Sequence, residues 1–60
     1  MIDAIDILAN LYRRARFAHG PARDVLLAEA RIVILNSRLP AADRRALLEE
    51  HTRLAREVRP

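Results

Sequence analysis

Two proline-containing breaks divide the chain into three segments of similar length. Pro21 follows Gly20, and Pro40 closes the second break, which starts at Ser37. Glycine suits the left-handed position that ends one helix, and proline suits the first turn of the next. Each segment is rich in Ala, Leu, Arg and Glu, and no β-branched residues alternate with polar ones over the length of a strand. The pattern predicts three helices, at about residues 3–18, 21–36 and 40–58.

Short connections between helices of similar length predict an all-α, antiparallel three-helix arrangement within one domain, residues 1–60. A chain of 60 residues buries only about 60% of the surface that its unfolded form exposes, so its core is marginal. The chain contains no Cys, which excludes a disulfide as the additional source of stability. We therefore expect dimerisation to complete the domain.

The second helix is apolar on two opposite sides. One side carries Val25, Leu26, Ile32 and Val33, and the other carries Leu27, Ile34 and Leu35 among charged residues. Either the two outer helices flank this helix in a flat layer, or its second side binds another molecule. In the second case the partner-binding residues are Leu27, Arg31, Ile34, Leu35 and Arg38. The partner is then a second copy of the chain or another protein.

Residues 12–23 form a basic segment that contains Arg13, Arg14, Arg16 and Arg23 and no acidic residue. Three interpretations of this segment are open: it is a solvated face, it contacts an acidic protein, or it contacts nucleic-acid phosphates. Phe17, on the polar side of the first helix, is either an ordinary exposed residue folding over the Gly20 turn or a partner-binding residue.

Glu29 lies among apolar neighbours on one side of the second helix. If the second helix runs antiparallel to both neighbours, Glu29 lies level with Tyr12 on the first helix and close to His51 on the third. Tyr12 and His51 each lie on the apolar face of their own helix. Since a buried carboxylate needs a partner, we expect these three residues to form a buried polar layer, with Arg44 as the alternative cation. The competing interpretation places Glu29 at the rim, in contact with water.

The sequence offers little for catalysis. It lacks a thiol, a lysine, a glycine-rich loop and any recognisable metal-ligand spacing, so no enzyme activity, catalytic residue, cofactor or metal is expected. The longest run of large apolar residues, 32–35, is far too short to span a membrane. Asp3 and Asp6 stand where a signal peptide would be basic, which predicts a cytoplasmic location.

Two function hypotheses follow. The first is a small, non-enzymatic helical interaction protein, such as an adaptor, inhibitor or regulator, that forms a homodimer and binds another protein. The alternative is a compact nucleic-acid-binding regulator that uses the basic segment 12–23 on phosphates.

Overall fold

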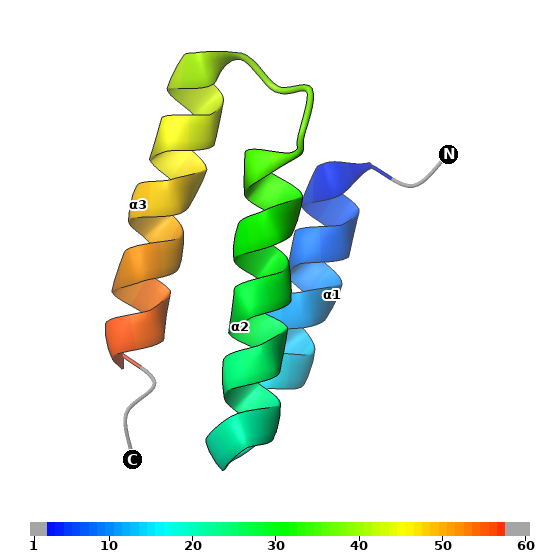
Figure 1. The fold of residues 1–60 in the computed structure, drawn as a ribbon, viewed down its shortest axis with the longest axis vertical. Helices are drawn as coiled ribbons and strands as arrows, with labels where there is room; N and C mark the ends of the chain where they lie inside the picture. The colour runs from blue at the N-terminus through cyan, green and yellow to red at the C-terminus, as the bar shows by residue number, and fades with distance from the viewer. Residues whose placement is uncertain (1–2, 58–60) are drawn as a thin grey trace.

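A computed structural model describes residues 3–57 of the chain as three antiparallel α-helices (Figure 1). Helix α1 spans Ala4–Arg16, α2 spans Gly20–Leu35 and α3 spans Ala41–Glu57. The predicted all-α arrangement is confirmed, and the predicted helix ends agree to within two residues. The predicted end of the third helix, at residue 58, lies outside the described residues.

The two breaks use their special residues in different ways. Gly20 has a φ of +59°, in the left-handed region, as expected for a glycine between two helices. Pro21 follows in the first turn of α2, where its missing N–H costs no helical hydrogen bond. The carbonyl of Pro40 accepts the N–H of Arg44 at 3.0 Å, so this proline immediately precedes α3 instead of being its first residue.

The three helices form a flat layer with α2 in the middle. Helices α1 and α3 lie on different sides of α2, and their backbones do not pack against each other (Figure 1). The layer measures 33 × 24 × 13 Å. The outer helices therefore flank α2 in a flat layer, which is the first of the two arrangements considered for its apolar sides.

The core is small and lies mainly between α1 and α2. Leu8 and Leu11 of α1 are buried together with Ala30 and Ile34 of α2. Because Ala30 carries only a methyl group, a neighbouring helix can approach its backbone closely. Five partly buried side chains pack against these four: Tyr12, Leu26, Val33, Leu47 and Leu48.

The rotation of α2 about its axis differs from the prediction at three positions. Ile34, predicted to bind a partner, is fully buried, so that assignment is wrong. Val25 and Ile32, predicted to face the core, are each 56% exposed. The reason is that α1 and α3 cover the sides of α2 that carry Ala30 and Ile34, and two neighbours leave the third side of a central helix open.

Candidate functional site: the open face of α2 and the α2–α3 groove

The open side of α2 carries a continuous apolar stripe. Val25, Ala28, Ile32 and Leu35 are exposed, and the three large side chains among them are 50–56% exposed. Their spacing of three, four and three residues keeps them on one face of the helix. We call these four residues the α2 stripe. Its spacing is that of the a and d positions through which paired helices pack.

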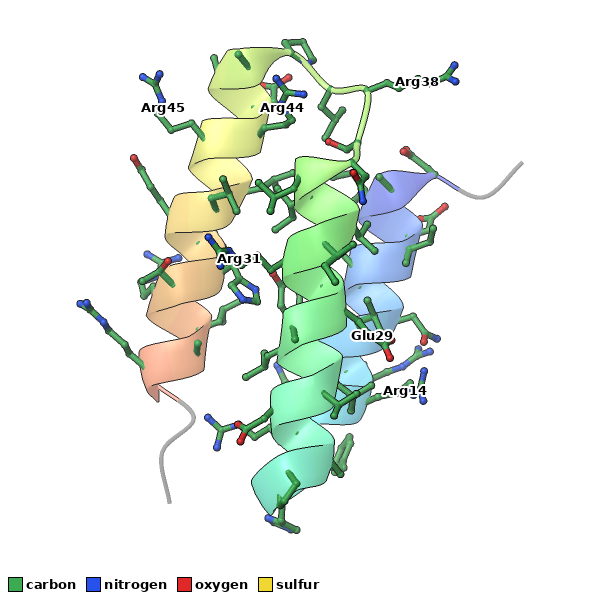
Figure 2. The ribbon with its side chains drawn as sticks, in the orientation of Figure 1. Arg14, Glu29, Arg31, Arg38, Arg44 and Arg45 are labelled. Atoms are coloured by element: carbon green, nitrogen blue, oxygen red, sulfur yellow. The ribbon has the colours of Figure 1, made fainter. Side chains whose placement is uncertain are left out.

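The residues predicted to bind a partner do not share one surface. Leu35 belongs to the α2 stripe, whereas Leu27 is half-buried. Arg31 extends from α2 toward α3, and Arg38 projects from the α2–α3 connection (Figure 2). Among the described residues, Phe17, directly after α1, is the most exposed large apolar side chain, at 77%. The structure thus separates the predicted set into the stripe, the side facing α3 and the two helix connections.

The basic segment does not form a single patch either. Arg13, Arg14 and Arg16 are exposed in the last turn of α1. At 100° per residue they fan over about 160° of the helix circumference. Arg23 is half-buried, and its Nη2 donates to the carbonyl of Ala55 at 3.3 Å. This hydrogen bond joins the start of α2 to the end of α3, so Arg23 is not a free phosphate ligand.

Two members of the predicted polar layer meet, and the third does not. The hydroxyl of Tyr12 lies 2.8 Å from Nδ1 of His51, and the ring centroids are 5.8 Å apart. Glu29 is exposed and points away from α3, on the α1 side of α2 (Figure 2). Its predicted place in a buried layer is therefore wrong, and the rim interpretation holds because a carboxylate reaches water there. Arg44 lies about two turns before His51 on α3 and does not replace it.

Burial shifts the titration of both partners. Desolvation raises the pKa of Tyr12, and the negative charge of Glu50 raises it further. Desolvation lowers the pKa of His51, and the positive charge of Arg31 lowers it further. The fold thus favours a neutral phenol beside a neutral imidazole. In the tautomer that carries its proton on Nε2, the imidazole accepts a hydrogen bond from the Tyr12 hydroxyl at Nδ1.

A groove between α2 and α3 is the feature that the sequence did not predict. It has a volume of about 490 Å³, and its lining is Arg31, Leu48, His51, Thr52, Ala55 and Arg56. Arg56 belongs to the polar face of α3, so nothing in the sequence linked it to Arg31. The two arginines line the same groove only because of the way α2 is rotated about its axis. The sequence does not determine this rotation, since α2 is apolar on two opposite sides.

No metal site or membrane span is found in the part of the chain that the structure describes. No group of three or more Asp, Glu or His residues within 3–57 could hold a metal ion. No helix among these residues has the length and apolar character needed to cross a membrane.

Comparison of the chain with family models, curated proteins and solved structures gives no match.

Proposed function

We propose that this chain is a small, non-enzymatic interaction protein that acts as a homodimer through the α2 stripe. The observation that carries the proposal is the exposure of Val25, Ile32 and Leu35 on one face of the central helix. An apolar stripe bounded by charged residues is typical of a surface that binds another protein. The stripe lies on the helix that both neighbours need for their own packing, so association there would stabilise the whole domain.

The size of the core supports a second copy as the occupant. Only five apolar side chains in the described residues are buried, and two of these are alanines. A domain of this size rarely reaches more than about 3–5 kcal/mol of stability from its core alone. Burial of the stripe adds apolar area without a disulfide or a metal, and each copy offers the same stripe. Such a self-complementary patch is what a two-fold dimer uses.

A further protein partner would use a different surface. Phe17 is 77% exposed next to the last turn of α1, where Arg13, Arg14 and Arg16 are exposed as well. An aromatic side chain among arginines has the composition of binding hot spots. These residues favour an acidic protein as the second partner. The nucleic-acid alternative has less support, because Arg23 is held against α3.

The test is the oligomeric state of the full chain, measured by sedimentation or light scattering. We expect a dimer at high micromolar concentration. The variant Val25→Glu/Ile32→Glu places two carboxylates on the stripe and should be a monomer. Since both side chains are already more than half exposed, its helical circular dichroism should remain. A matched control, Ala9→Glu/Ala42→Glu, adds the same charge at exposed positions of α1 and α3 and should stay dimeric.

A native chain that is folded and monomeric at that concentration would contradict the proposal. So would a dimer that survives the two stripe substitutions. Variants at Leu27 and Ile34 are unsuitable for this test, because Ile34 is fully buried and a charge there would unfold the domain.

A further inference from the structure

The groove between α2 and α3 has a one-sided charge. Arg31 lines it from α2, and Arg56 lines it from α3. No carboxylate is among the six lining residues that the structure describes. Neither arginine forms an ion pair with a residue whose side chain the structure describes. The ion pair found among those side chains, Arg53–Glu50, lies outside the groove lining. Two arginines that line one groove, with ten N–H donors between them, are therefore available to an anion.

One of the residues that line the groove is an imidazole held in a fixed position. His51 is only 8% exposed, and the hydroxyl of Tyr12 fixes its Nδ1 at 2.8 Å. The hydrogen bonds of the described residues leave Nε2 without a partner on the chain. His51 therefore supplies a third nitrogen to the groove whose orientation is set before any ligand arrives.

The remaining lining residues restrict the kind of ligand. The hydroxyl of Thr52 donates to the carbonyl of Leu48 at 3.0 Å, so its proton is not available to an anion. Leu48 and Ala55 give the groove an apolar wall. A ligand that matches these surfaces has an oxyanion for the arginines and a short apolar part for the wall.

We propose that the α2–α3 groove binds an oxyanion, a phosphate or carboxylate group, between Arg31 and Arg56 and above His51. Arginine recognises both groups through paired N–H donors in its planar fork. None of the four stripe residues lines this groove, so the inference goes beyond the proposed dimer and does not depend on it.

Binding of the anion is coupled to a proton on His51. Tyr12 from α1 and Arg31 from α2 act directly on this imidazole. On its own helix, Arg56 lines the same groove, and Glu50 acts on the hydroxyl of Tyr12. In the free protein Arg31 opposes protonation of His51. A bound oxyanion offsets the charge of Arg31 and favours the imidazolium. The affinity should therefore rise as the pH falls through the range in which His51 takes up its proton.

The experiment is a titration of the full chain, followed by NMR of the His51 ring and the arginine Nε–H groups. One arm uses inorganic phosphate and the other acetate, each against chloride at constant ionic strength. We expect saturable shifts at His51, Arg31 and Arg56 in at least one arm, and the arm that saturates identifies the preferred group. The pKa of His51 should rise in the saturated protein.

Variants separate the site from general charge attraction. Arg31→Gln/Arg56→Gln changes two exposed side chains and should weaken binding at least about tenfold without loss of helix. The matched control, Arg45→Gln, removes a charge on α3 that projects away from the groove (Figure 2) and should bind like the native chain. His51→Gln should remove the pH dependence.

Shifts that stay linear in both arms, or an equal loss in Arg45→Gln, would overturn the proposal. The titration is repeated with Val25→Glu/Ile32→Glu. Retained binding in that variant, whatever its oligomeric state, keeps the anion site separate from the proposed dimer.

Discussion

The hydroxyl of Tyr12 and Nδ1 of His51 are 2.8 Å apart and join the two outer helices of the layer, although the backbones of α1 and α3 do not pack against each other. The bond crosses 39 positions of sequence and lies beside the core. In a flat layer the outer helices depend on α2 for almost all their contacts. A direct polar link between them restricts how far either can rotate or slide.

Removal of the Tyr12 hydroxyl tests this link. Tyr12→Phe keeps the ring but leaves the buried Nδ1 of His51 without its partner. An unsatisfied buried polar group costs about 1–3 kcal/mol, so the free energy of unfolding should fall by that amount. Urea unfolding at fixed protein concentration measures it. Thr52→Val also removes a hydroxyl but at an exposed site, and should change the stability by less than about 0.5 kcal/mol.

A double-mutant cycle assigns the effect to the pair. Tyr12→Phe and His51→Leu should show a coupling energy above about 0.5 kcal/mol, since the two side chains touch. Glu29→Gln and His51→Leu should be additive, because Glu29 is exposed and points away from α3. Additivity in the first cycle would show that the hydrogen bond does not contribute to folding.

His51 gives the stability an acid limit. Burial and Arg31 lower its pKa in the folded chain, while the unfolded chain takes up the proton near the ordinary value of about 6.5. Between these two values the unfolded state binds more protons, so stability is lost as the pH falls below about 6.5. Urea midpoints measured from pH 8 to pH 5 should show this decrease. It should disappear in His51→Leu and persist in His19→Gln, where the replaced side chain is exposed.

Most of the fold was predictable because its signals are local. Gly20 and Pro21 mark one connection, and the segment between Ser37 and Pro40 marks the other. A break of this kind acts through the backbone of its own residues, so it needs no knowledge of the rest of the molecule. The helix count and the antiparallel order followed from these residues and from the short connections.

The rotation of α2 was not predictable, and with it most of the candidate site. Val25 and Ile32 lie on one side of the helix and Ile34 on another, and hydrophobicity alone ranks the two sides equally. The choice depends on which sides α1 and α3 cover, which is a property of packing between distant segments. Tyr12 and His51 were predictable as a pair because each lies on the single apolar face of its own helix. The prediction for Glu29 was wrong because it depended on the rotation of α2, which the sequence did not determine.

The left-handed conformation of Gly20 predicts a specific loss of stability. Apart from its chain neighbours and the backbone of its own helix, nothing lies within 4 Å of the position that a Cβ would take, so the cost of a side chain here is conformational and not crowding by a packed neighbour. Gly20→Ala should destabilise the chain by about 1–2 kcal/mol. Gly20→Asn should cost less, since asparagine tolerates this region better. Equal effects of Ala and Asn in thermal or urea unfolding would show that φ at this position is not the cause.

The exposed arginines at the end of α1 predict weak, salt-sensitive attraction to nucleic acid. Each phosphate contact on duplex DNA contributes a slope of about −0.9 to the plot of log K against log salt concentration. Arg13, Arg14 and Arg16 fan around α1, and Arg23 is held by the carbonyl of Ala55, so the basic segment offers no more than three contacts. We therefore expect fluorescence anisotropy with a generic duplex to show a slope no steeper than about −3 and no measurable binding at physiological salt. Arg13→Gln/Arg14→Gln/Arg16→Gln should abolish the low-salt binding, and Arg45→Gln should not. Three scattered arginines are too few to bind duplex DNA tightly at physiological salt. Tight binding under that condition would therefore favour the nucleic-acid alternative over the interaction protein proposed above.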